Sequence, residues 1–219
     1  MEWTQAIDAY CERTSAALWA EPVNAASNLA FLLAAGFGWV LHRRFPQSRA
    51  LIVFAALAGV IGVGSFLFHT FANRWSVLAD TVPIAVFIHA YFGFALHRLV
   101  GLGKAAALGG TAAFFGLSIL LEPALSPILG SSAAYAGALL ALFGIGSWLA
   151  CAGRPAKTLV LGAGAVFTVS LAFRMADGPI CEALPLGTHF LWHILNAAVL
   201  ALLIRAAAPL PPRGPGDRS

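Results

Sequence analysis

Apolar residues in this chain occur in long runs separated by short polar segments. A membrane-crossing helix needs about 20 apolar residues, and most of the runs approach that length. Strands of a membrane barrel would instead alternate apolar and polar residues over about ten positions, and no run does so. We therefore predict an all-α polytopic membrane protein with seven transmembrane helices, at about 22–41, 51–70, 78–96, 105–121, 132–151, 158–173 and 187–205.

The composition supports a membrane protein. Charged residues make up 10% of the 219 positions and apolar residues 60%, with a mean hydropathy of +0.84. A soluble domain averages about 25% charged residues and still exposes much of its surface to water. These values exclude a soluble enzyme and a disordered chain. The basic residues lie in short clusters between apolar runs, so the net charge of +4 does not indicate a nucleic-acid partner.

The distribution of Lys and Arg predicts the orientation of the helices. One side of the predicted bundle carries most of these residues, and the other carries only Arg13, Arg74 and Arg174. The basic side should face the cytoplasm, which puts the N-terminus outside and the C-terminus inside. We expect one domain over 1–208, with an extracytoplasmic acidic segment at 1–21 and a disordered cytoplasmic tail at 209–219. The first residues lack the basic and apolar regions of a cleaved signal peptide. The short Ala-rich loops favour a bacterial inner membrane.

Five polar side chains fall near the outer ends of three predicted spans. Ser65 and His69 are one helical turn apart, as are His189 and His193, and Asp80 begins the third span. A single buried histidine is more often structural, but these residues share one depth in the membrane. Polar groups inside a membrane are candidates for function. Three neutral imidazoles suit Zn²⁺, and a fourth open position is typical of a catalytic site.

Three carboxylates precede the first span, namely Asp8, Glu12 and Glu21. Oxygen ligands grouped in this way suit Ca²⁺. From the spacing alone, a solvated acidic segment is the better interpretation, with Glu21 favoured by the dipole of the helix that follows.

The cysteines differ in their predicted compartment. Cys11 and Cys181 lie on the outer side, where oxidising conditions permit a disulfide between them. Cys151 lies at the inner end of the fifth span and should be a free thiol.

Taken together, these motifs resemble the alkaline ceramidase family, within a wider group of seven-span hydrolases that includes adiponectin-receptor-like proteins. Each motif is weak alone, but together they cover nearly the whole chain in the order of the family. The matching residues are Tyr10-Cys11-Glu12, Glu21-x-x-Asn24-x-x-Ser27-Asn28, Gly64-Ser65-x₃-His69, Asp80 and His189-x₃-His193.

The resemblance implies specific roles for these residues. His69, His189 and His193 would hold zinc, Asp80 would accept a proton from the attacking water, and Ser65 would stabilise the oxyanion. It also implies a calcium site and a disulfide between Cys11 and Cys181. The calcium ligands would be the side chains of Asp8, Glu12 and Glu21 and the carbonyl of Tyr10, with Thr14 at a position where the family usually has Asn.

The sequence thus predicts an intramembrane zinc-dependent amidase, whose substrate is ceramide or another N-acyl lipid. Two other functions fit the same residues. One is a seven-span receptor or membrane-remodelling protein in which zinc is structural. The other is a proton or ion transporter, in which Asp80 and the histidines form a relay.

Overall fold

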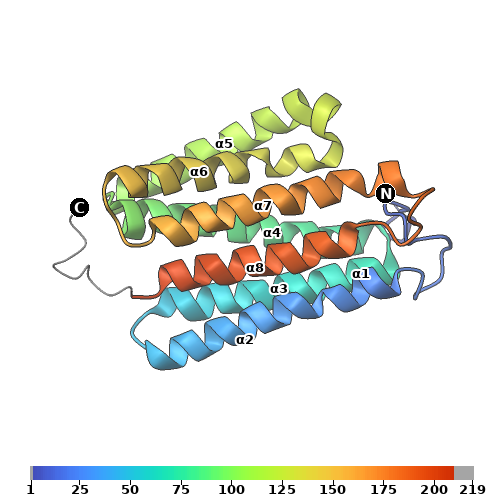
Figure 1. Cartoon of the computed structure of the whole chain (residues 1–219), viewed down its shortest axis with the longest axis horizontal. Helices are drawn as coiled ribbons and strands as arrows, with labels where there is room; N and C mark the ends of the chain where they lie inside the picture. Colours follow the sequence, from blue (N-terminus) through green and yellow to red (C-terminus); the bar gives the residue numbers. More distant parts are fainter. Residues whose placement is uncertain (1, 210–219) are drawn as a thin grey trace.

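The structure is a computed structural model that describes residues 2–209. Residues 210–219 lie outside the described part, so the predicted disorder of the tail stays a prediction. Within the described part the named elements are all helical, as the apolar pattern predicts, and Figure 1 shows them as an elongated bundle. The elements in chain order are α1 (Pro22–Ser27), α2 (Leu29–Arg44), α3 (Arg49–Phe71), α4 (Arg74–Phe94), η1 (Ala95–Val100), α5 (Lys104–Leu129), η2 (Gly130–Tyr135), α6 (Ala136–Cys151), α7 (Lys157–Ala176), η3 (Gly178–Ile180) and α8 (His189–Ala207).

Six continuous helical stretches among the described residues are long and apolar enough to cross a membrane. One of them, Lys104–Cys151, is 48 residues long and contains α5, η2 and α6. Figure 1 shows that α5 and α6 run side by side in opposite directions, with η2 at the reversal. This reversal begins at Gly130, whose φ of +54° is readily adopted only by glycine.

Several helices extend beyond the predicted spans. The third was expected at 78–96, but α4 begins at Arg74 and a π-helical segment continues it to Val100. The fourth was expected to end at 121, but α5 continues to Leu129 through two prolines. Polar residues toward the helix ends, such as Arg74 and Glu122, interrupt the apolar pattern, so hydropathy alone makes the predicted spans too short.

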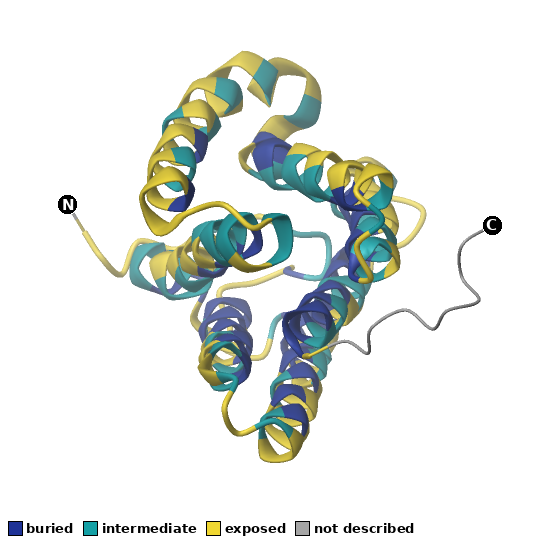
Figure 2. Ribbon diagram, turned by 90° about the vertical axis from the view of Figure 1, so that its left-hand side faces the viewer, coloured by how far each residue is buried: buried dark blue, intermediate teal, exposed yellow. Residues whose placement is uncertain are grey.

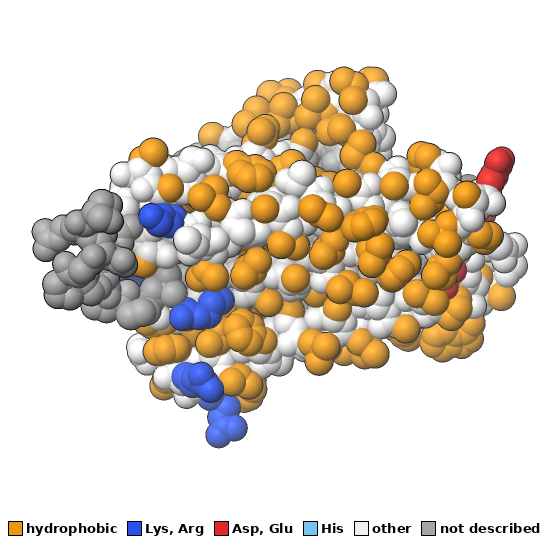
Figure 3. All heavy atoms as spheres, in the orientation of Figure 1, with side chains coloured by type: hydrophobic (Ala, Val, Ile, Leu, Met, Phe, Trp, Pro, Cys, Tyr) orange, Lys and Arg blue, Asp and Glu red, His pale blue; other side chains and the backbone are white. Residues whose placement is uncertain are grey.

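The core lies between α2, α3, α4, α7 and α8, where the buried apolar side chains include Phe31, Ile61, Phe87, Leu200 and Ile204. Figure 2 shows buried residues concentrated on these helices, whereas α5 is largely exposed. Large apolar side chains also cover the outside of the bundle, as Figure 3 shows. Such a surface would be unstable in water and is typical of helices that face lipid.

The turn between α3 and α4 sets the depth of several polar residues. Ala72 ends α3 with a φ of +43°, and Asn73 and Ser76 cap α4 through reciprocal side-chain hydrogen bonds. The N-terminal segment pairs with this turn, since the amide of Ile7 donates to the carbonyl of Ala72 at 2.7 Å. The segment before α1 is therefore held against the ends of α3 and α4.

Candidate metal centre

Three buried histidines converge at one end of the bundle. His69 lies in the last turn of α3, and His189 and His193 lie in the first turns of α8. Each is at most 2% exposed, and one ring nitrogen from each lies within 4.8 Å of the others. This is the only such metal-binding group of His, Cys, Asp or Glu found within residues 2–209. The structure therefore brings together the three predicted zinc ligands.

Glu21 orients the first of these rings. Its Oε2 lies 2.5 Å from Nδ1 of His69, and its Oε1 accepts a hydrogen bond from Arg13. Burial alone would raise the pKa of Glu21, but its hydrogen bonds and charge interactions with His69 and Arg13 lower it below the usual value. An ionised carboxylate only accepts hydrogen bonds, so Nδ1 of His69 donates, and in the neutral ring the lone pair is then on Nε2. That Nε2 is buried and has no hydrogen-bond partner among residues 2–209.

Ser27 orients another of the rings. Its hydroxyl oxygen lies 2.7 Å from Nδ1 of His193 and donates to the carbonyl of Asn24 at 2.8 Å. A serine hydroxyl has one proton, so the contact with His193 requires Nδ1 to be the donor. The Nε2 lone pair of His193 is then free for a metal. Ligating histidines commonly donate their second nitrogen to such a partner.

Asp177 fixes the start of α8. Its Oδ1 accepts hydrogen bonds from the amides of Thr188 and His189, at 2.7 and 2.9 Å, and its Oδ2 accepts from the amide of Cys11 at 3.0 Å. The predicted disulfide between Cys11 and Cys181 is present and ties the same segments together. These contacts hold the first histidine of α8 in a defined position.

Tyr10 covers one side of the histidine cluster. Its ring stacks on that of His189, with centroids 3.6 Å apart, and lies 5.3 Å from that of His69. Burial raises the pKa of the Tyr10 phenol, so it stays neutral at physiological pH. The N-terminal segment thus shields the cluster from water.

A close approach of α3 and α4 places Ser65 and Asp80 near each other. Gly64 permits this approach, because a Cβ at this position would overlap the carbonyl oxygen of Ala79 and lie 3.3 Å from the amide nitrogen of Asp80. Ser65 is buried, and Oδ1 of Asp80 is buried without a hydrogen-bond partner in the described part of the chain.

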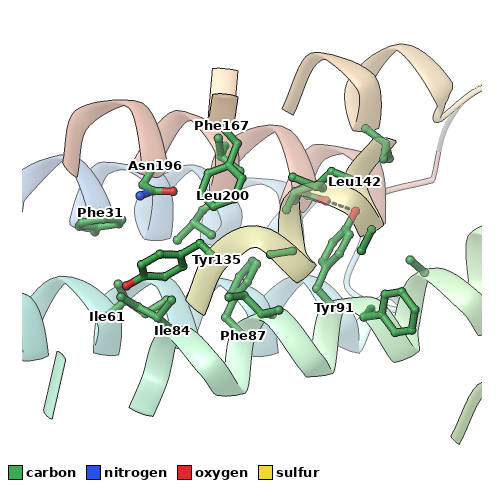
Figure 4. Close-up of a pocket in the computed structure, with 18 of the residues that line it drawn as sticks. Phe31, Ile61, Ile84, Phe87, Tyr91, Tyr135, Leu142, Phe167, Asn196 and Leu200 are labelled. Atoms are coloured by element: carbon green, nitrogen blue, oxygen red, sulfur yellow. Dashed lines mark hydrogen bonds between the residues drawn. The ribbon is translucent and has the colours of Figure 1, made fainter. Parts of the chain in front are cut away.

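An apolar cavity leads from these residues into the bundle. Its walls include Ser65, Asp80 and His193 at one end and Leu203 further along α8. Ten residues of helix separate His193 from Leu203, which corresponds to about 15 Å at 1.5 Å per residue. Figure 4 shows aromatic and aliphatic side chains lining the cavity, with the amide of Asn196 among them.

The predicted calcium donors do not come together in this way. Asp8 and Thr14 are exposed, and both oxygens of Glu12 accept hydrogen bonds from the amides at the start of α1, those of Val23 and Asn24. The carbonyl of Tyr10 accepts from the amide of Arg13. With Glu21 bound to Arg13 and His69, the structure does not support the predicted calcium site.

Sequence reasoning missed the partners that support the histidines. The charge distribution identifies Arg13 only as one of the few basic residues on the predicted outer side, and no motif in the sequence marks Asp177. The positions of Glu21 and Ser27 before and within the first span gave no indication that they contact histidines 48 and 166 residues away. Such contacts depend on how the chain before α1 folds back, which local spacing does not determine.

The donor set fits a zinc ion, since three buried imidazoles converge and the second nitrogens of two of them are held by a carboxylate and a hydroxyl. The fold and the site thus define an apolar helical bundle with a candidate metal centre that opens into an apolar cavity. The family model for ceramidase matches residues 4–208, and the chain therefore belongs to the ceramidase family. A comparison with curated proteins gives no match.

Proposed function

We propose that the chain is an intramembrane zinc-dependent amidase. It hydrolyses the N-acyl amide bond of ceramide, or of a related N-acyl lipid, to a fatty acid and an amine such as sphingosine. Membership of the ceramidase family supports hydrolysis of ceramide. The observation that carries the zinc-dependent mechanism is that His193, Ser65 and Asp80 line one apolar cavity beside the histidine cluster.

The residues around this cavity can each take a separate role in amide hydrolysis. His69, His189 and His193 would hold the zinc ion, which would supply a more acidic bound water and a Lewis acid for the carbonyl. Asp80 accepts the proton that the attacking water loses and returns it to the leaving nitrogen. The hydroxyl of Ser65 donates a hydrogen bond to the carbonyl oxygen as negative charge develops there. Water thus adds its hydroxyl to the acyl carbon and a proton to the amine.

The rest of the cavity is suited to a lipid chain. Its lining is almost entirely aromatic or aliphatic, so an acyl or sphingoid chain would bury apolar surface there. An apolar chain running about 15 Å along α8 would hold its amide at the end near the histidines. This arrangement favours a long-chain lipid amide over a soluble peptide or a small polar amide.

We further propose seven membrane crossings with the N-terminus outside. α1 and α2 together form the first crossing, and α5 and α6 are separate crossings joined by η2. The separation of charge supports this topology, because the Lys and Arg residues visible in Figure 3 lie at the end of the bundle opposite the acidic side chains. The bacterial inner membrane remains our proposed location.

The test is release of fatty acid from ceramide by the purified protein, measured by mass spectrometry. Zinc removal by a chelator should abolish release, and zinc should restore it. His193→Ala should abolish release, whereas His97→Ala should not, because Nδ1 of His97 contacts the carbonyl of Leu102 at the basic end, far along the chain from the histidine cluster. Unchanged hydrolysis by His193→Ala would refute the proposal. Zinc binding without hydrolysis of any N-acyl lipid would favour a structural metal, and proton flux that does not need zinc would favour a transporter.

A further inference from the structure

We propose that the guanidinium of Arg13 is the resident cation beside Glu21, that it positions His69 for metal binding, and that the centre needs no calcium. The assignment of zinc to the histidines rests on the proposed function. Arg13 does not contact the reacting atoms and acts through Glu21, so it is a positioning residue.

Arg13 is buried where the loop after it, the residue before α1 and the last turn of α3 meet. Its side chain donates to Glu21, to the carbonyls of Ser15 and Ala17, and to the carbonyl of His69. The distances are 2.5 Å from Nε to Oε1 of Glu21, 3.2 and 3.3 Å from Nη1 to the two loop carbonyls, and 3.2 Å from Nη2 to His69. Arg13 is 7% exposed and Glu21 1%. A buried charge of either sign would be costly without the other.

These contacts link Arg13 to the main chain and to the ring of His69. The guanidinium holds the main-chain carbonyl of His69 directly and holds its ring through Glu21. The Glu21 carboxylate is shared, with one oxygen on Arg13 and the other on Nδ1 of His69. Its position therefore depends on Arg13, and the direction of the His69 Nε2 lone pair depends on Glu21.

The same contacts engage the carboxylate oxygens that a divalent ion would use. The oxygens of Glu12 and Glu21 that would bind calcium already accept hydrogen bonds. A divalent ion that shared Glu21 with Arg13 would also be repelled by the guanidinium at short range. An arginine supplies only one positive charge, but its planar donors can bind the carboxylate and three carbonyls together.

The experiment measures zinc affinity and calcium response in the purified full-length protein. Zinc affinity is obtained by competition with a chelator, and the calcium response by thermal stability in EGTA and in added Ca²⁺. Arg13→Gln should weaken zinc binding about 10- to 100-fold, as expected for loss of support to a metal ligand. Arg13→Lys should fall between Arg13→Gln and the unmodified protein, because Lys keeps the charge but not the planar donor set. Arg74→Gln, on the same outer end, is the matched control and should leave zinc affinity unchanged.

The unmodified protein should show the same stability and zinc affinity in EGTA and in millimolar Ca²⁺. A rise in either quantity on adding Ca²⁺ would overturn the proposal, as would unchanged zinc affinity in Arg13→Gln. If Arg13→Gln does not fold, Arg13→Lys and the calcium titration of the unmodified protein still decide the question. Failure of lipid hydrolysis with these zinc results intact would refute the proposed function and leave the role of Arg13 standing.

Discussion

The hydrogen bond between Ser27 and His193 gives a sharp test of the metal centre. Ser27→Ala removes one oxygen atom from the N-terminal part of the first apolar stretch and leaves no acceptor 2.7 Å from Nδ1 of His193. His193 is 1% exposed, so water cannot readily replace the serine. The ring is then free to rotate, and its Nε2 is no longer directed at the metal.

The expected loss of zinc affinity in Ser27→Ala follows from the kind of hydrogen bond that is removed. A net hydrogen bond contributes about 0.5–1.5 kcal/mol, and leaving a buried donor unpaired costs about 1–3 kcal/mol. A loss of about 1.4 kcal/mol corresponds to a tenfold weaker zinc affinity. Glu21 makes a charge-assisted hydrogen bond to His69, so removing the Glu21 carboxylate should weaken zinc binding more than removing the Ser27 hydroxyl.

Zinc affinity in purified variants is again measured by competition with a chelator. Ser118→Ala is the matched control, because Ser118 makes the same kind of bond to a carbonyl of its own helix, in α5. Ser27→Thr keeps the hydroxyl and should bind zinc almost as tightly as the unmodified protein. Equal zinc affinities for Ser27→Ala and Ser118→Ala would refute the reasoning.

Three further variants test the surroundings of the site. Gly64→Ala should separate α3 from α4 and lower stability by about 1–3 kcal/mol, seen as a lower melting temperature, whereas Gly116→Ala has open space around it and should not. Asn196 places an uncharged amide in a mainly apolar lining, where it can hydrogen-bond a hydroxyl of the lipid. Asn196→Leu should therefore lower the rate for ceramides with a hydroxyl near the amide relative to ceramides without it, measured with the two lipids in competition. Ala138→Leu should narrow the cavity and shift hydrolysis toward shorter chains, while the exposed Ala172→Leu should leave the chain-length profile unchanged.

The convergence of the three histidines was accessible from the sequence. His69 ends one predicted span and His189 and His193 begin another, so the directions of the spans place them at one depth. The disulfide could be predicted for a similar reason, since of the three cysteines only Cys11 and Cys181 fall on the predicted outer side. In both cases the predicted depth or side of the membrane groups the residues, and the structure brings the expected residues together.

The contacts made by the segment before α1 could not be predicted in this way. Calcium ligands among its carboxylates are predicted mainly by the family resemblance, because their spacing alone favours a solvated acidic segment. In the structure, Arg13 donates a hydrogen bond to Glu21, and Glu12 accepts hydrogen bonds from the amides at the start of α1. The path of an irregular segment is set by such long-range pairs, and hydrophobic periodicity carries no information about them.

The most direct test of the metal centre is X-ray absorption at the zinc edge of the purified protein, together with metal content. We predict one zinc ion per chain with three imidazole nitrogens at about 2.0–2.1 Å. In His193→Ala, this three-nitrogen shell should be lost. Protein that hydrolyses ceramide without zinc, or a zinc shell that is unchanged in His193→Ala, would contradict the account.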